Sequence, residues 1–182
     1  MIKAIFLDRD GVINEDNGYT YKIDDFKLLK GVIQGLKAFK RLDYEIIIVT
    51  NQAGIARGLF SVDDFRKFMK HLIRTLNENK IQVLDYFFCP HHPEGKIELY
   101  SIKCSCRKPN IGMLLEAKEK YNIDFSKSIL IGDKESDILA GKKAGLLSDI
   151  LITNDSSIQN SHASHQANDL IEASNIVAKY LD

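Results

Sequence analysis

The stretch IKAIFLDRDG, residues 2–11, is a short apolar run that ends in two acidic residues and a glycine. Its apolar part, Ile2–Leu7, has the length and character of a strand that is buried on both faces of a parallel sheet. Four later runs of the same kind are also predicted to be strands: Tyr44–Thr50, Leu84–Cys89, Ser128–Gly132 and Asp149–Thr153.

Amphipathic patterns separate these runs. Val32, Leu36 and Phe39 recur at helical spacing and predict a helix over Val32–Leu42. Apolar strands that alternate with amphipathic helices indicate a doubly wound α/β fold, with a parallel sheet covered on both faces. The polar stretch Asn154–Asn168 is predicted to be a solvated loop. The same periodicity predicts four further helices: Val62–Leu76, Ile111–Tyr121, Ser136–Ala144 and Asp169–Leu181.

Length and composition fit a single domain over residues 1–182. The chain has 182 residues, of which 45% are hydrophobic and 27% are charged, as in ordinary globular proteins. Lys plus Arg and Asp plus Glu both number 25. This balance argues against a nucleic-acid-binding surface and gives no reason to expect a membrane partner. The apolar runs are too short for a signal peptide or a spanning helix, so we expect a cytoplasmic protein.

Polar side chains follow three of the predicted strands directly. Asp8 and Asp10 follow the first, Thr50 closes the second, and Asp133 follows the fourth. In a doubly wound sheet the ligand crevice lies beyond the carboxyl ends of the strands, so these groups should meet at one edge.

The motifs also give expectations for Arg9 and Asp137. Arg9, between the two aspartates, is expected to point away along the strand. Asp137 either contacts Lys134 or a metal, or lies on a helix surface where it stabilises the helix dipole.

Four segments occur in an order that is typical of one enzyme superfamily: DRDGV at residues 8–12, Thr50, Lys108-Pro109 and GDKESD at residues 132–137. On these motifs the chain resembles the haloacid dehalogenase-like phosphotransferases. DRDGV alone could be a capped turn without chemistry, but the other three segments weigh against that alternative. The stretch Gly11–Val32 is too short for a sizeable cap domain, which leaves the site open to water and favours hydrolysis.

The resemblance implies a division of roles among these residues. Asp8 would attack phosphorus and form an aspartyl-phosphate, and Asp10 would act first as acid and then as base. Thr50 and Lys108 would stabilise the transferring phosphoryl group, whose negative charge otherwise repels a carboxylate nucleophile. A catalytic Mg²⁺ would be held by Asp8, Asp10 (through its backbone carbonyl) and Asp133.

The three cysteines of the chain all lie between residues 89 and 106. Cys89 and His91 form one arm and Cys104 and Cys106 the other, and a Cys₃His set is typical of structural zinc sites. With four protein ligands, Zn²⁺ would hold the loop between the arms and leave no position for substrate. The alternatives are three reduced thiols without a metal, or His92 as the ligand in place of His91.

Longer motifs narrow the resemblance to one family. The segments DRDGVIN at 8–14, TNQAGIARG at 50–58, CPHHP at 89–93 and CRKP at 106–109 are similar to the D-glycero-D-manno-heptose 1,7-bisphosphate 7-phosphatases. The resemblance implies a cytoplasmic monomer whose partner is a small sugar bisphosphate, with no nucleic acid or membrane partner. Its product would serve nucleotide-activated heptose and lipopolysaccharide synthesis. The same resemblance implies these substrate-binding residues: Asp16, Asn17, Gly18, Tyr19, Asn51, Gln52, Ala53, Arg107 and Lys134.

Several points remain open within this interpretation. Ala53 stands where the family often has Ser, and a lost hydroxyl contact with the sugar would cost ~1 kcal/mol. Arg57 and Arg107 could clamp a remote phosphate through their guanidinium groups, or form surface salt bridges. The alternative substrate is histidinol phosphate, because the histidinol-phosphate phosphatases share these motifs. A phosphate-binding zinc scaffold without turnover is the alternative of another class, and the sequence leaves the anomer of the sugar undecided.

Overall fold

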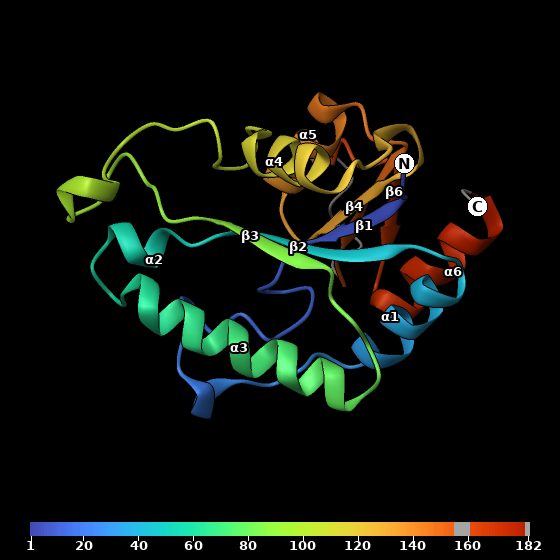
Figure 1. The fold of residues 1–182 in the computed structure, drawn as a ribbon, viewed down its shortest axis with the longest axis horizontal. Helices are drawn as coiled ribbons and strands as arrows, with labels where there is room; N and C mark the ends of the chain where they lie inside the picture. The colour runs from blue at the N-terminus through green and yellow to red at the C-terminus, as the bar shows by residue number, and fades with distance from the viewer. Residues whose placement is uncertain (155–160, 181–182) are drawn as a thin grey trace.

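The computed structural model describes residues 1–154 and 161–180. Within these residues a six-stranded parallel sheet forms the centre of the molecule, in the order β3-β2-β1-β4-β5-β6 (Figure 1). The strands are β1 (Ala4–Leu7), β2 (Glu45–Asn51), β3 (Asp85–Cys89), β4 (Ile129–Gly132), β5 (Ser148–Ile152) and β6 (His165–Ala167).

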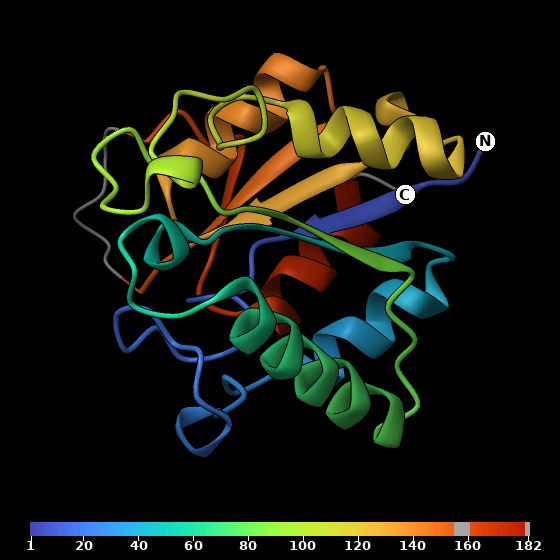
Figure 2. The ribbon, with the colours of Figure 1, turned by 60° about the vertical axis from the view of Figure 1, so that its left-hand side comes forward.

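Helices cover both faces of the sheet, which confirms the predicted doubly wound α/β fold (Figures 1 and 2). Helices α1, α3 and α6 pack on one face, α4 and α5 pack on the other, and the short α2 follows β2. No helix among the described residues is both long and apolar enough to cross a bilayer. The helices are α1 (Val32–Arg41), α2 (Ala53–Ala56), α3 (Val62–Glu78), α4 (Gly112–Tyr121), α5 (Glu135–Ala144) and α6 (Leu170–Tyr180).

The central strand β1 shows why the fold has two cores. All four of its residues are fully buried. Successive side chains of a strand point to opposite faces, so Ile5 and Leu7 pack with α1, α3 and α6, whereas Ala4 and Phe6 pack with α4 and α5. A strand that is buried on both faces needs the continuous apolar run that the sequence shows.

Helix α3 begins at a capping box. The Ser61 hydroxyl accepts from the backbone N–H of Asp64 at 3.1 Å, and the Asp64 carboxylate accepts from the backbone N–H of Ser61 at 3.0 Å. These bonds satisfy backbone donors that the first turn leaves free. The helix then buries a stripe of its inner face, including Phe65, Phe68 and Leu76, against the sheet.

The structure departs from the predicted elements in two places. The loop predicted over all of Asn154–Asn168 is wrong at its end, because His165–Ala167 forms β6 and pairs with Ile150–Ile152 of β5. Of these three residues only Ala167 is buried, so this strand depends on pairing with β5 and has no apolar pattern that predicts it. The short α2 was also not predicted. Residues 155–160 of the predicted loop and Leu181 of the last predicted helix lie outside the described residues.

The strand order brings distant segments together at one edge. Because β1 lies between β2 and β4, the residues after these strands are neighbours in space. The backbone N–H of Asp8 donates to the carbonyl of Ile131 in β4 at 2.9 Å, so the pairing continues up to the first aspartate. Asp8, Thr50 and Asp133 therefore meet at the carboxyl edge of the sheet, as predicted.

Candidate active site

A cavity of about 480 Å³ opens at this edge. Most of the predicted site residues at this edge form part of the cavity wall. The exceptions are Thr50, Asp133 and Asn17. Ser136 was not predicted, although it belongs to the GDKESD motif that follows β4. The predicted residues in the wall are Asp8, Asp10, Asp16, Gly18, Tyr19, Asn51, Gln52, Ala53, Arg107, Lys108 and Lys134, joined by Arg57, His92, Ser136 and Asp137.

Lys108 is a buried cation at the base of the site, with 3% of its surface exposed. Its Nζ lies 3.1 Å from Asp8 Oδ1 and 2.7 Å from Asp137 Oδ1. Burial by itself favours the neutral amine, but the carboxylates of Asp137 and Asp8 hold the pKa of Lys108 above its usual value. The ammonium also donates to the Val49 carbonyl at 2.6 Å, which fixes its position. Lys108 therefore presents a fixed positive charge to Asp8.

Asp137 is not on the helix surface, so that alternative is wrong. Its side chain is 1% exposed, and it pairs with Lys108 while one oxygen accepts from the backbone N–H of Lys134 at 3.1 Å. The burial arises because α5 begins directly after β4 and turns its first residues towards the strand ends. A Cβ atom on Gly132 would collide with the Asp137 side chain, so the glycine that ends β4 allows this close approach.

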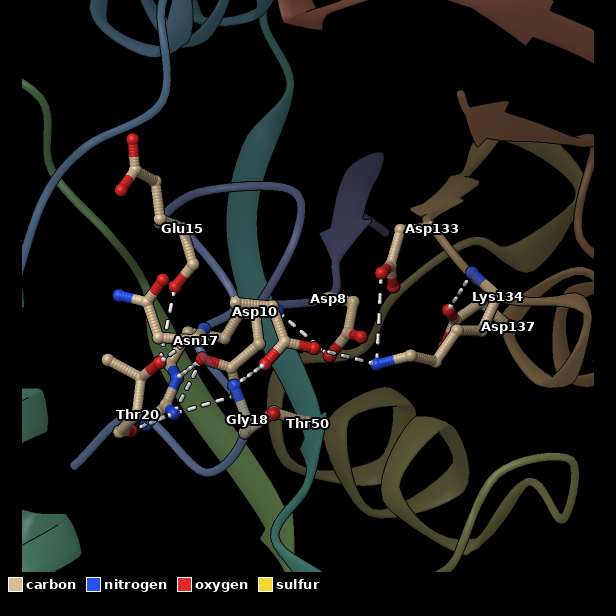
Figure 3. Close-up of polar contacts among 12 residues, drawn as sticks. Asp8, Asp10, Glu15, Asn17, Gly18, Thr20, Thr50, Asp133, Lys134 and Asp137 are labelled. Atoms are coloured by element: carbon tan, nitrogen blue, oxygen red, sulfur yellow. Dashed lines mark hydrogen bonds and ion pairs between the residues drawn. The ribbon is translucent and has the colours of Figure 1, made fainter. Parts of the chain in front are cut away.

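Asp133 lies across the strand ends from Asp8 (Figure 3). One oxygen from each of Asp8, Asp133 and Asp137 lies within 4.8 Å of the other two. Burial and the negative charge of Asp8 raise the pKa of Asp133 to about 7, and its Oδ1 is buried without a hydrogen-bond partner among the described residues. Crowded carboxylates with an unpartnered oxygen fit a hard divalent cation such as Mg²⁺.

Gly11 permits the approach of Asp133 to the first strand. Its φ is +78°, and a Cβ atom at this position would collide with the Asp133 carboxylate. Glycine adopts positive φ without steric cost, whereas other residues are strained there. The glycine of the DRDG motif is thus a steric requirement of the acidic cluster.

The Asp10 carboxylate lies apart from this acidic cluster. In Figure 3 it is on the side of the loop that carries Asn17 and Gly18, with Asp133 on the other side of Asp8. It accepts hydrogen bonds from Arg9 at 2.7 Å, from Asn14 Nδ2 at 3.0 Å and from Gln52 Nε2 at 3.1 Å. The part of Asp10 predicted to meet the metal is its backbone carbonyl, and that assignment remains a prediction.

The expected orientation of Arg9 is wrong. Its side chain is fully buried and returns to the Asp10 carboxylate, with Nη2 within 2.7 Å of both carboxylate oxygens. A buried guanidinium needs a compensating anion, and Asp10 supplies it. The alternation of side chains along a strand does not apply here because β1 ends at Leu7, before the aspartates.

Residues 50–52 connect the acidic groups to Lys108. Gln52 Nε2 donates to Thr50 Oγ1 at 2.9 Å as well as to Asp10. Asn51 pairs with the backbone of Lys108, donating to its carbonyl and accepting from its N–H, both at 3.1 Å. The Asn51 amide thus supports the lysine that follows the cysteine loop.

One side of the cavity rim carries an ion pair. Lys134 Nζ lies 3.3 Å from Asp16 Oδ2 and 3.7 Å from Asp133 Oδ2. Partial burial opposes the lysine charge, but the neighbouring carboxylates, Asp133 first, raise the pKa of Lys134. The pair links the loop that contains Asp16 to the start of α5.

The cavity wall also contains two arginines, Arg57 and Arg107. The Arg57 guanidinium lies 5.9 Å from the centre of the Tyr19 ring, and Arg107 donates to the His91 carbonyl at 3.3 Å. Arg57 Nε is buried without a hydrogen-bond partner among the described residues. His92, which sequence reasoning treated only as an alternative zinc ligand, also forms part of this wall.

The predicted zinc ligands come together. Cys89 Sγ lies 3.0 Å from Cys106 Sγ and 3.5 Å from Cys104 Sγ, and His91 Nδ1 lies 3.3 Å from Cys106 Sγ. Sulfurs bound to one tetrahedral zinc ion would lie roughly 3.8 Å apart, given Zn–S bonds of about 2.3 Å. The observed spacing is slightly tighter, and the donor set fits Zn²⁺. His92 is not in this group.

Beyond these ligands the loop between β3 and α4 docks on α2 (Figure 1). The backbone N–H groups of Lys96 and Ile97 both donate to the Ala56 carbonyl, at 2.7 and 2.9 Å. The ligands Cys104 and Cys106 immediately precede Arg107 and Lys108, so the cluster anchors the chain where it enters the cavity wall.

Comparison with known proteins gives the family that the sequence motifs resemble. The sequence matches the family described as polynucleotide kinase 3 phosphatase over residues 3–182. A D-glycero-alpha-D-manno-heptose-1,7-bisphosphate 7-phosphatase of Photorhabdus laumondii is 50% identical over 145 residues, which cover 80% of this chain and 79% of that protein. A D-glycero-beta-D-manno-heptose-1,7-bisphosphate 7-phosphatase of Haemophilus influenzae is 46% identical over 152 residues, 84% of this chain and 82% of that protein. This chain belongs to the D-glycero-D-manno-heptose-1,7-bisphosphate 7-phosphatases.

A solved structure from the heptose bisphosphate phosphatases agrees with this family. The enzyme from B. bronchiseptica, complexed with magnesium and phosphate, has a TM-score of 0.81 and 27% identity, with coverage of 97% of this chain and 98% of that chain. The chain is therefore a phosphoric monoester hydrolase with the haloacid dehalogenase-like fold. Family membership confirms the predicted resemblance and weighs against the scaffold without turnover.

Proposed function

We propose that this enzyme removes the C7 phosphate of D-glycero-D-manno-heptose 1,7-bisphosphate through an aspartyl-phosphate on Asp8. The observation that carries the proposal is the position of the Asp8 carboxylate, which lies in the cavity wall, 3.1 Å from buried Lys108 and within 4.8 Å of an Asp133 oxygen. The names of the heptose bisphosphate phosphatases at 46–50% identity support the choice of substrate.

Asp8 and Asp133, with the backbone carbonyl of Asp10, would hold Mg²⁺. The crowded carboxylates and the unpartnered Asp133 Oδ1 support this donor set. When bound, Mg²⁺ offsets the negative charge of the phosphate ester and orients it towards the nucleophile.

In the first half of the reaction, an Asp8 carboxylate oxygen attacks phosphorus, and the bond between phosphorus and the sugar oxygen breaks. Asp10 donates a proton to that oxygen, which leaves as an alcohol. Lys108 offsets the charge of the phosphoryl group. Thr50 Oγ1 accepts from Gln52, so its own hydrogen is available for a phosphoryl oxygen.

In the second half, Asp10 accepts a proton from water as the water oxygen attacks the aspartyl-phosphate. The bond between phosphorus and the Asp8 oxygen breaks, inorganic phosphate is released, and the Asp8 carboxylate is restored. Asp10 returns to its protonated form, so the two half-reactions balance.

The two arginines of the cavity wall would hold the rest of the substrate. Arg57 and Arg107 offer forked donors for the remote C1 phosphate, and the loop Asp16–Tyr19 with Ala53 would line the sugar. The balanced overall charge favours a small bisphosphate over a polynucleotide.

The proposal also covers the cysteine cluster, the state of the protein in the cell and the use of its product. Zn²⁺ held by Cys89, His91, Cys104 and Cys106 would fix the loop that places Arg107 and Lys108. We further propose that residues 1–182 form one domain, active as a cytoplasmic monomer without nucleic acid or membrane partners. Its product would enter the synthesis of nucleotide-activated heptose for lipopolysaccharide.

Phosphate release in the presence of Mg²⁺ tests the proposal. The substrates are the α and β anomers of heptose 1,7-bisphosphate, histidinol phosphate and an oligonucleotide with a 3′-phosphate, with Asp8→Asn as the blank. We expect kcat/KM for one heptose anomer to exceed the values for histidinol phosphate and for the oligonucleotide by at least about tenfold, or about 1.4 kcal/mol. A preference for either of those two would overturn the sugar assignment and leave the chemistry at Asp8 intact.

A further inference from the structure

Arg9 is a charged side chain in the core for which the proposed reaction has so far no use. It is fully buried, and it lies in sequence between the nucleophile and the acid/base. Its guanidinium lies over the face of Phe68, 4.6 Å from the ring centre, and 5.6 Å from that of Phe65. Both rings belong to the inner face of α3. Nη2 also donates to the Thr20 carbonyl at 2.6 Å, so the guanidinium is held from two sides.

The hydrogen bonds at Asp10 make its two carboxylate oxygens unequal. Oδ1 accepts from Arg9 Nε at 3.0 Å, from Arg9 Nη2 at 2.7 Å and from Asn14 Nδ2 at 3.0 Å. Oδ2 accepts from Arg9 Nη2 at 2.7 Å and from Gln52 Nε2 at 3.1 Å. A carboxylate oxygen offers about two lone-pair sites, so Oδ1, with three donors, is the more heavily occupied of the two oxygens.

Oδ2 is also the Asp10 oxygen that lies nearer to the predicted position of the phosphoryl group. Its partner Gln52 donates from the same nitrogen to Thr50, next to the predicted position of the phosphoryl group. Gln52 and Asp10 both form part of the cavity wall. A proton that moves between Asp10 and the substrate therefore has Oδ2 as its carrier.

We propose that Arg9 is a positioning residue: its Nε and Nη2 groups grip both oxygens of Asp10 and hold the carboxylate so that Oδ2 faces the leaving oxygen and, later, water. Phe65 and Phe68 in turn hold Arg9, so the orientation of the acid/base depends on α3, which has no residue in the cavity wall. This inference rests on the proposed function, because it assumes that Asp10 transfers both protons.

The role predicts a specific kinetic signature. p-Nitrophenolate is a good leaving group that needs no proton, whereas a sugar alkoxide needs one. Without an oriented Asp10, p-nitrophenyl phosphate should still phosphorylate Asp8 quickly, but water should attack the aspartyl-phosphate slowly. One equivalent of p-nitrophenolate per enzyme should then appear as a burst.

The experiment compares stopped-flow bursts and sugar bisphosphate turnover in the wild-type enzyme and three variants. Asp10→Asn defines the signature, and Arg9→Met removes the charge at similar volume. Leu76→Ala, on the same buried face of α3 two turns beyond Phe68, is the control for lost packing. We expect Arg9→Met to show the burst and at least about a 100-fold loss of sugar bisphosphate turnover. Leu76→Ala should show no burst.

Each outcome decides between the alternatives. A burst in Asp10→Asn but not in Arg9→Met would overturn the positioning role and leave the proposed function intact. No burst in Asp10→Asn would overturn the acid/base role of Asp10 and the inference with it. If Arg9→Met does not fold, Phe68→Leu replaces it. That variant keeps Arg9 but removes one of the two rings that pack against it. It should show a smaller burst than Asp10→Asn, and no burst at all would count against the proposal.

Discussion

The acidic cluster and the cysteine cluster are both suited to a metal ion, but their surroundings differ. Asp8 lies in the wall of the cavity, and an oxygen of Asp133 has no hydrogen-bond partner among the described residues. In the cysteine cluster the sulfurs of Cys89, Cys104 and Cys106 lie within 3.5 Å of one another, and His91 completes the group.

The difference follows from the donors. Carboxylates that face a cavity leave coordination positions for water and substrate, which a catalytic ion needs. Four ligands from the protein complete a tetrahedron and leave no such position, which is typical of a structural ion. The first cluster should therefore control turnover, and the second should control the loop.

The largest effect should come from the acidic cluster. Asp8→Asn removes the nucleophile, so we expect phosphate release to fall at least about 10⁴-fold. The melting temperature should stay within a few degrees, because the side chains are nearly equal in size and Asp137 still pairs with buried Lys108. Asp63→Asn, on the exposed side of α3, is the matched control and should keep the wild-type rate. Turnover by Asp8→Asn above a hundredth of that rate would contradict the assignment.

Removal of Mg²⁺ should have the next largest effect. Chelation with EDTA should reduce kcat at least about 100-fold, and added Mg²⁺ should restore it. Hydrogen exchange of the loop between Cys89 and Cys106 should not change, since its anchor is the other cluster. Asp133→Asn should show the same loss without recovery. A loop that opens under EDTA treatment with zinc retained would show that the two clusters are not independent.

Loss of a cysteine ligand should affect the loop and the stability of the protein more than turnover, the reverse of Mg²⁺ removal. Cys104→Ser should release zinc, detectable by elemental analysis, and should lower the melting temperature by about 4–8 °C, equivalent to about 2 kcal/mol. Hydrogen exchange of the loop between Cys89 and Cys106 should become faster. Phosphate release should fall about tenfold, because the metal cluster no longer fixes the chain next to Arg107 and Lys108. Ser105→Ala, between two ligands, is the control. Unchanged loop protection in Cys104→Ser would remove the structural role from this cluster.

The smallest effect concerns pH. A proton competes with the metal at Asp133, whose pKa is raised to about 7 by burial and by Asp8. As pH falls from 8 to 6, the carboxylate becomes protonated in the folded metal-free enzyme, so apparent Mg²⁺ affinity should decrease by up to about tenfold. Titration calorimetry at the two pH values measures this. An affinity that does not change, or that increases at pH 6, would contradict the shifted pKa.

The sequence predicted the parts of the molecule that depend on local pattern. The five apolar runs were placed within two residues of their observed boundaries. Strands β1, β2, β4 and β5 are buried nearly throughout, so the hydrophobicity of these segments indicates their position directly. In the edge strand β3 only Phe87 and Cys89 are buried. The strand His165–Ala167 has no such pattern and forms because β5 offers an open edge, which no local signal reveals.

The same distinction holds in the candidate site. That Asp8, Asp133 and the four cysteine-cluster ligands would gather was determined by the sequence, because strand ends and short-range spacing fix where their backbones lie. The contacts of Arg9 with Asp10 and of Asp137 with Lys108 were decided by the tertiary structure. Arg9 and Asp10 are adjacent in sequence, but the guanidinium is buried and turned back only because Phe68 of α3 packs against it. Lys108 and Asp137 meet because the fold brings two distant segments together, and a buried charge needs such a partner.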